Sequence, residues 1–259
     1  MANCRRPRLW MRAGEPGHSR RYDALPLFCS SVAMFKLSLH LCSPSDSLAS
    51  QVQRLAMDDL TTLSSVALAP SNPLYPLYQY VFGLEIHHYL QSMAGTKDQP
   101  VELLLAMDTE APDRMLGFAL YLPALGAPQA CTLLCLAVIP SHRRQGIGAA
   151  LLEEMTARYP HAEATCSVAT FDWFAAQGWH ALGASGPQLV VGTRRARVAG
   201  TVRRLDLAPL FATLEVRQIH AYLLKQHGRK AMVQAEKQRD YRLDQLTWQA
   251  AELLRSRQA

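Results

Sequence analysis

Two kinds of hydrophobic pattern alternate along residues 34–205. Short apolar stretches typical of β-strands are separated by stretches in which apolar residues recur with the period of an α-helix. The pattern predicts strands at 35–41, 101–107, 115–122, 131–139, 163–168, 188–193 and 197–205, and helices at 47–60, 77–93, 148–159 and 170–177. This β-α-α-β-β-β-α-β-α-β-β order predicts an α/β fold with a mixed central sheet flanked by helices.

Beyond Pro209 the pattern is purely helical. Two long segments without internal proline meet at Gly228, and each has a broken apolar stripe. We expect a helical hairpin that packs on the preceding domain or on a second copy of the chain, so that a homodimer through these helices is one option. The predicted organisation is therefore residues 34–207 as one domain and residues 208–259 as a C-terminal helical extension.

The first 33 residues mix Arg, Pro, Gly and Ser without periodicity, and we expect a disordered basic extension. No apolar segment of the kind found in secretory signals follows the arginines; a mitochondrial transit peptide is the alternative. Because Met34 opens the first predicted strand, a further hypothesis is that translation naturally begins there.

Composition favours a globular protein, with 49% hydrophobic and 19% charged residues. No apolar stretch approaches the ~20 residues that span a bilayer, so we expect a soluble chain without a membrane partner. The six cysteines form no CxxC pair, which predicts neither a disulfide framework nor a metal site and favours a reduced, cytoplasmic setting.

The net charge of +6 comes from the two ends of the chain. Residues 1–33 hold six arginines and two acids, and residues 210–259 hold nine basic and five acidic residues. A basic tail can attract nucleic acid, but acids are interspersed in the C-terminal segment and no recognition motif occurs. Nucleic acid is therefore not an expected partner, although an interaction role for the tail stays open.

The stretch "LAVIPSHRRQGIGAALLEEM", residues 136–155, carries the candidate chemistry. A strand ends at Pro140, two arginines follow, and Gly146 and Gly148 precede a helix. It is not a Walker A loop, because no Lys-Ser/Thr follows Gly148, and Leu151 stands where a dinucleotide fingerprint needs a small residue. Two glycines at a helix start, with unpaired amides and the positive end of the helix dipole, still suit a pyrophosphate.

Residues 143–148, "RRQGIG", fit the Q/R-x-x-G-x-G/A signature of the GNAT acetyltransferases, and "DWFAAQGW" (172–179) resembles a later segment of that family. The resemblance implies a GNAT-like fold and acetyl-CoA as co-substrate. It implies that pyrophosphate is held by backbone amides of Gln145, Gly146, Ile147, Gly148 and Ala149. It also implies that Leu136, Ala137 and Val138 pair with the pantetheine arm and that Arg143 and Arg144 assist.

The sequence departs from the family at the acid and the base. Phe174 stands where many members have a proton-donating tyrosine, and Ser167 replaces an asparagine; we expect Phe174 to pack against the co-substrate. The central strand holds no carboxylate. Candidate bases are Glu85, His87 and His88 on the second predicted helix, which in this fold borders the acceptor site.

We therefore expect an acetyl-CoA-dependent N-acetyltransferase whose acceptor is a primary amine of a small molecule or peptide, attacking the thioester directly. One alternative is a non-catalytic acyl-CoA-binding or regulatory module, as the missing tyrosine and strand carboxylate would allow. The other is an interaction protein that works through its basic helical tail. The sequence does not identify the acceptor.

Overall fold

The computed structural model describes residues 34–93 and 99–258 of the chain. The basic extension predicted at residues 1–33 lies outside the described residues.

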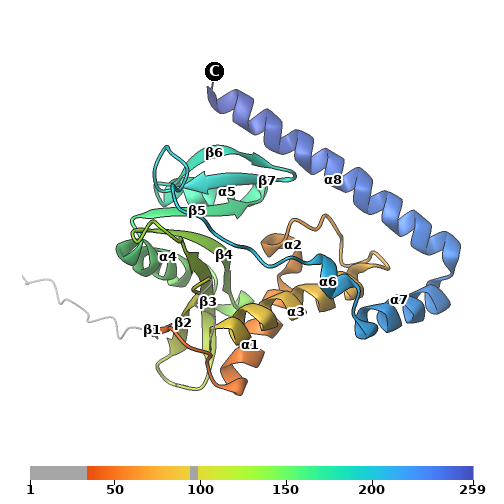
Figure 1. Ribbon diagram of the computed structural model, residues 1–259, viewed down its shortest axis with the longest axis horizontal. Helices are drawn as coiled ribbons and strands as arrows, with labels where there is room; N and C mark the ends of the chain where they lie inside the picture. The colour runs from red at the N-terminus through yellow and green to blue at the C-terminus, as the bar shows by residue number, and fades with distance from the viewer. Residues whose placement is uncertain (1–33, 94–98, 259) are drawn as a thin grey trace, which may run out of the picture. The chain divides into compact units, whose positions relative to one another are not determined.

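One seven-stranded mixed sheet forms the centre of the fold (Figure 1), in the order β1-β2-β3-β4-β5-β7-β6. Neighbouring strands are antiparallel except for β4 and β5, which run parallel. The strands are β1 (Phe35–His40), β2 (Glu102–Asp108), β3 (Met115–Pro123), β4 (Ala130–Val138), β5 (His161–Cys166), β6 (His180–Ser185) and β7 (Gln188–Gly192).

Helices cover both faces of this sheet, as the alternating pattern predicts. The helices are α1 (Asp46–Asp58), α2 (Leu60–Leu63), α3 (Tyr75–Ser92), α4 (Ile147–Arg158), α5 (Val168–Ala176), α6 (Ala208–Phe211), α7 (Leu214–His227) and α8 (Arg229–Gln258). One apolar core lies under α1 and α3, and another under α4 and α5. The predicted α/β class, with a mixed sheet and C-terminal helices, is confirmed.

The prediction of the last two strands is partly wrong. The stretch at 197–205 is irregular and forms no strand of the sheet; its one backbone bridge joins Thr201 to Leu125, outside the named strands. The closing hairpin is instead β6 and β7, joined at Gly186 with φ +57°. The β6 sequence "HALGAS" contains no β-branched residue, so its pattern gives no strand signal, whereas Val198, Thr201 and Val202 imitate one.

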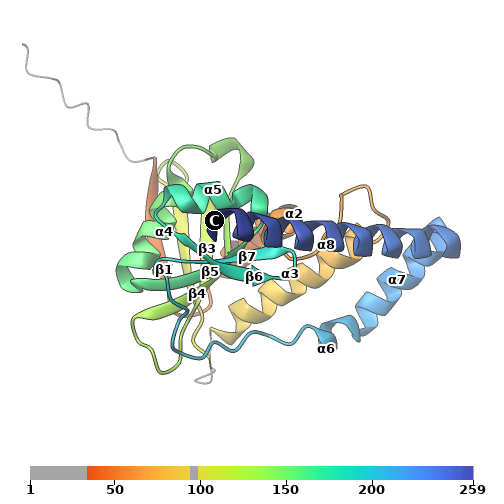
Figure 2. The same ribbon diagram turned by 90° about the horizontal axis from the view of Figure 1, so that it is seen from above.

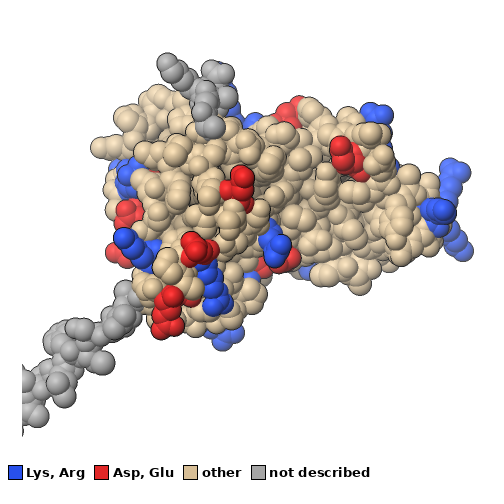
Figure 3. Space-filling model, turned by 90° about the horizontal axis from the view of Figure 1, so that it is seen from below, with Lys and Arg blue, Asp and Glu red and all other residues tan. Residues whose placement is uncertain are grey.

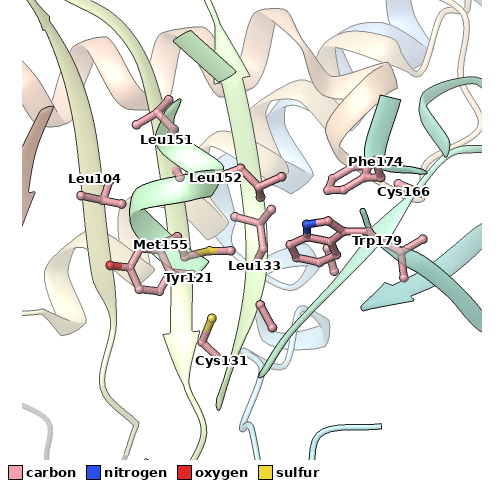
Figure 4. Packing of buried hydrophobic residues seen from close by; sticks show 14 of the residues in the cluster. Leu104, Tyr121, Cys131, Leu133, Leu151, Leu152, Met155, Cys166, Phe174 and Trp179 are labelled. Atoms are coloured by element: carbon pink, nitrogen blue, oxygen red, sulfur yellow. The ribbon is translucent and has the colours of Figure 1, made fainter. Parts of the chain in front are cut away.

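In the core between α4 and the sheet, the apolar residues of α4 pack against the strands (Figure 4). Ile147, Leu151, Leu152 and Met155 recur at helical spacing and are all buried. Three cysteines, Cys131, Cys135 and Cys166, are also buried and behave as small apolar residues. Burial raises the pKa of the Cys166 thiol to about 11, so this thiol stays protonated near neutral pH.

A buried carboxylate ties α4 to β2. Glu102 accepts hydrogen bonds from the hydroxyls of Tyr121 (2.9 Å) and Tyr159 (2.7 Å) and from the guanidinium of Arg158 (3.2 Å). The two tyrosine rings also meet edge to face, with centroids 5.8 Å apart. Because every member of the cluster is satisfied, it fixes the C-terminal end of α4 and is not available for chemistry.

The C-terminal helices pack on their own chain, which is one of the two arrangements expected (Figures 1 and 2). Leu210, Val216 and Leu223 from α6 and α7 join Met232 of α8 in a core with α3 and the loop before it. The far end of α8 packs through Ala250 on the core beside α5. Along the described chain, no helix combines the length and apolar character needed to cross a bilayer. On the face drawn in Figure 3, acidic and basic side chains are interspersed, and basic ones gather at the end where α7 meets α8.

Candidate active site

The sheet opens between β4 and β5. The parallel ladder ends at Leu133–Ala164, although β4 continues to Val138. A bulge lies at the same place, because Leu120 pairs with Cys135 and Tyr121 with Leu133, which leaves Leu134 without a partner on β3. The strand beyond the bulge therefore has one free edge.

Backbone alternation shows which of the predicted strand residues face that free edge. The amide of Ile139 donates to Leu116 of β3, so Ala137, two residues earlier, also faces β3. Leu136 and Val138 turn their backbone groups the other way, toward the opening. A ligand can thus pair with Leu136 and Val138, whereas Ala137 contributes through its position between them.

The segment before α4 forms a cradle of unpaired amides. Among the described residues, none accepts a hydrogen bond from the amides of residues 144–149. Arg144 and Gly146 both have left-handed backbone, with φ of 61° and 82°. Left-handed residues in a short turn allow successive N–H groups to face one side, as in an anion-binding nest, and the α4 dipole adds to the attraction. A Cβ built on Gly146 meets no atom within 4 Å, so the space in front of the cradle is open.

The two arginines of the cradle have different environments. Arg143 is engaged, since its Nε donates to the carbonyl of Val138 (2.9 Å) and its terminal nitrogen to Asp59 at the end of α1 (2.7 Å). It therefore braces the turn against α1. Arg144 is exposed and makes no side-chain hydrogen bond or ion pair with any described residue, so its charge is available to a bound anion.

A small cavity of about 120 Å³, which we call the cradle-side cavity, lies in the opening of the sheet. Phe174 and Trp173 of α5 form one wall, and Leu133, Leu134 and Leu136 of β4 form another. Phe174 is held between Trp173 and Trp179, with ring centroids at 4.9 and 5.3 Å; Figure 4 shows it beside Trp179. Trp173 also lies 3.5 Å from the Cβ position of Gly148, so α5 places two aromatic rings beside the cradle.

Ser167, at the position of the family's asparagine, caps α5. Its hydroxyl oxygen accepts a hydrogen bond from the Thr170 amide at 3.2 Å. This bond stabilises the first turn of α5 and thereby the orientation of both rings. The presence of serine at position 167 is thus explained by its role as the N-cap of α5.

A second cavity of about 280 Å³, which we call the α3 cavity, lies on the other side of β4. It shares Leu63, Leu134 and Thr165 with the cradle-side cavity, so the two cavities meet at the bulge of β4. Its wall on α3 is formed by residues at helical spacing: Tyr78, Val81, Phe82, Glu85, Ile86 and Tyr89. The remaining lining comes in equal parts from residues 63–66, from the strands and from residues 204–211.

Glu85 is the carboxylate of the α3 cavity. Its side chain makes no hydrogen bond or ion pair with any described residue. Burial raises the pKa of Glu85 to about 7, and the nearby Arg204 opposes that rise. A carboxylate with a pKa near neutrality is suited to accept a proton at physiological pH.

Tyr89 lies one turn further along the same face of α3. Its hydroxyl oxygen accepts a hydrogen bond from the Leu205 amide at 2.9 Å, so the hydroxyl keeps its own proton for another partner. Burial is the main cause that raises the pKa of Tyr89, which keeps the phenol protonated. The cavity therefore contains a potential proton acceptor and a potential proton donor.

His87 and His88, the other candidate bases, are exposed and line neither cavity. Their rings contact each other at 6.0 Å. Helical geometry turns His87 to the opposite side of α3 from Glu85, whereas His88, three residues after Glu85, lies at the margin of that face and is exposed. The structure thus brings only Glu85 of the three candidates to the cavity.

Sequence reasoning missed Trp173 and Arg204, and it gave Tyr89 no chemical role. Trp173 is adjacent to Phe174 in the segment "DWFAAQGW", so the family resemblance pointed close to it. The α3 spacing alone could have joined Tyr89 to Glu85. Arg204 lies in an irregular stretch that was predicted as a strand, and only the run of five arginines at 194–204 marks it.

Residues 68–184 match the sequence profile of the acetyltransferase (GNAT) family. The chain therefore carries a GNAT acetyltransferase domain, which confirms the resemblance and the enzyme class. No curated protein sequence matches the chain.

Two solved acetyltransferase structures show a partial likeness to the chain. An acetyltransferase of the GNAT family from Desulfovibrio desulfuricans is 17% identical, with 62% of this chain and 99% of that chain covered and a TM-score of 0.42. The PaiA N-acetyltransferase from Thermoplasma acidophilum, solved with coenzyme A, is 13% identical, with 61% and 99% covered and a TM-score of 0.46.

Proposed function

We propose that the protein is an acetyl-CoA-dependent N-acetyltransferase that acetylates a primary amine by direct attack. The observation that carries the proposal is the meeting of the cradle-side cavity and the α3 cavity at Leu134, where β4 leaves β5. A donor held on the cradle side and an amine held on the α3 side would face each other at that bulge. Bringing two reactants together in this way is itself a large part of catalysis.

The residues of the cradle fit the co-substrate. The unpaired amides of residues 144–149 and the charge of Arg144 would hold the pyrophosphate, and Leu136 and Val138 would pair with the pantetheine arm. Phe174 and Trp173 would pack beside it. Acetyl-CoA supplies the acetyl group as a reactive thioester.

Glu85 would act as the proton acceptor and Tyr89 as the proton donor. Glu85 takes a proton from the incoming ammonium, which frees the nitrogen lone pair to attack the carbonyl carbon. As the new C–N bond forms and the C–S bond breaks, Tyr89 gives its proton to the departing sulfur. The nitrogen then loses its second proton, which restores Tyr89 directly or through water. The product amide carries the acetyl group and Glu85 returns its proton to solvent.

The test is acetyl-CoA turnover, followed by thiol release and mass of the product, against polyamines, amino acids, aminoglycosides and peptides. Gly146→Asp should abolish acetyl-CoA binding in calorimetry, because it places a carboxylate in the cradle. Gly126→Asp is the matched control, since Gly126 has nearly the same φ (78°) and the same open surroundings outside the site. Unchanged affinity in a folded Gly146→Asp protein would remove the cradle assignment.

One alternative has an observation in its favour. Phe174 cannot donate a proton, so a non-catalytic acyl-CoA-binding module remains a second candidate function. It predicts acetyl-CoA binding that depends on Gly146 but no turnover with any amine. Steady CoA release above the rate without amine would exclude it.

A further inference from the structure

The charged side chains around the α3 cavity are arranged differently from those around its neighbour. A cavity of about 590 Å³, which we call the β6 cavity, shares Thr165 and Arg204 with the α3 cavity. Glu163 in the β6 cavity is satisfied, because Arg197 lies 3.2 Å away and the Val198 amide also donates to it. That pair is neutralised, so Arg204 is the charged side chain of the β6 cavity that has no partner among the described residues.

Glu85 and Arg204 remain available. Both line the α3 cavity, yet neither side chain has an ion pair or a hydrogen bond with any residue in the described part of the chain. Arg204 is nevertheless close enough to lower the pKa of Glu85 against the effect of burial. Opposite charges that share a cavity without bridging complement a ligand that carries both an ammonium and an anionic group.

The rest of the α3 cavity is mixed, because Ser64, Ser65, Thr165 and Gln188 line it beside the apolar side chains. Its aromatic and aliphatic walls come from α3 and from residues 205–211, and Tyr78 meets Phe211 edge to face with centroids 5.6 Å apart. Its volume of about 280 Å³ is just below the ~300–1,000 Å³ of typical small-molecule sites. These dimensions favour a compact acceptor with an apolar side chain.

We propose that the acceptor is an apolar α-amino acid, with its amine at Glu85, its carboxylate at Arg204 and its side chain against the walls of the α3 cavity. This inference rests on the proposed function and specifies its substrate. A planar guanidinium suits the task because it can donate two parallel hydrogen bonds to a carboxylate. Arg204 would then be a substrate-binding residue that selects amino acids over plain amines.

The experiment compares three acceptors with the full-length protein at pH 8.5: L-leucine, L-leucinamide, and isoamylamine. Wild type should prefer leucine over isoamylamine in kcat/KM by about 10- to 100-fold, the effect of a hydrogen-bonded charge pair, and leucinamide should behave like the amine. Arg204→Gln should remove that preference mainly by raising the KM for leucine, and it should affect isoamylamine much less, because isoamylamine has no carboxylate to lose from Arg204. Arg204→Lys should keep part of it. Arg203→Gln is the matched control, because Arg203 is exposed and lines neither cavity.

Two results would overturn the inference: isoamylamine or leucinamide equal to leucine in wild type, or an Arg204→Gln protein that loses all three activities in equal proportion. Turnover of other amines without turnover of leucine would also overturn it and leave the proposed function standing. Absence of turnover with every amine would instead remove the proposed function itself.

Discussion

Replacement of Glu85 by glutamine tests the proton acceptor, because it keeps the shape of the side chain and removes its charge. A positioned general base contributes about 10²- to 10⁴-fold to rate, so kcat/KM should fall by about that factor. His87→Gln and His88→Gln serve as controls on the same helix, and both should retain wild-type activity because the two histidines lie outside the cavity.

The Glu85 pKa of about 7 also sets the pH dependence of wild-type activity. A carboxyl with that pKa is ionised to about 9% at pH 6 and about 91% at pH 8, so kcat/KM should rise about tenfold over that range and then level off. The charged and titratable groups that face Glu85 are Arg204, Tyr89 and Cys135, and only Arg204 is charged throughout this range. Arg204 lowers the pKa of Glu85, so in Arg204→Gln the break should move to higher pH.

Stability gives a readout that does not depend on activity. Because burial raises the folded pKa of Glu85 above its ordinary value of 4.5, the contribution of Glu85 to stability is complete below about pH 4.5. It is lost as pH rises toward 7. Between pH 5 and 8 the free energy of unfolding of the wild type should fall by up to about 2.5 kcal/mol more than that of Glu85→Gln. Solvent screening makes this figure an upper bound.

The assay is thiol release from acetyl-CoA with one fixed amine from pH 5.5 to 9, together with thermal unfolding of both proteins at pH 5 and 8. A wild-type profile that rises without a break up to the pKa of the amine would show that Glu85 takes no proton. Wild-type activity in Glu85→Gln, or its loss in His88→Gln, would equally refute the assignment.

Further predictions concern other parts of the molecule. Tyr89→Phe should lower kcat by about 10²-fold or more while the KM for acetyl-CoA stays unchanged, measured by steady-state kinetics; an unchanged kcat would mean that water protonates the sulfur. Glu102→Ala should destabilise by about 3–5 kcal/mol, because it leaves buried hydroxyls and a guanidinium without their partner, and Glu102→Gln should cost less; equal melting temperatures for Ala and wild type would contradict this. Trp173→Ala should raise the KM for acetyl-CoA several-fold with little change in stability, since Trp173 is partly exposed beside the cradle; an unchanged KM would remove it from the donor site.

The cradle could be predicted from sequence because all of its atoms come from one short stretch. Gly146, its neighbours and the start of α4 are fixed by local conformation, so their order along the chain is nearly their order in space. The family resemblance rests on that same stretch, and the sheet around it was predicted with boundaries close to those observed, apart from the last hairpin.

The α3 cavity could not be predicted in the same way, because its residues come from separate segments. Glu85 lines the same cavity as Arg204, which is more than a hundred positions away in an irregular stretch without periodicity. The continuous apolar run of β4 also does not predict the bulge at Leu134 or the separation of β4 from β5 at that point. Helical spacing on α3 does carry usable information, since it groups Glu85 with Tyr89 and turns His87 away from them.

The C-terminal helices acquire a role that their composition does not suggest. Leu207 and Phe211 line the α3 cavity, and Arg239 of α8 donates a hydrogen bond to the hydroxyl of Tyr78, another cavity residue. The apolar contacts of α7 and α8 with the segment at 68–81 hold these residues in place. The extension therefore helps to shape the cavity that would receive the acceptor, and variation in it would change which amine is accepted without touching the cradle that would bind acetyl-CoA.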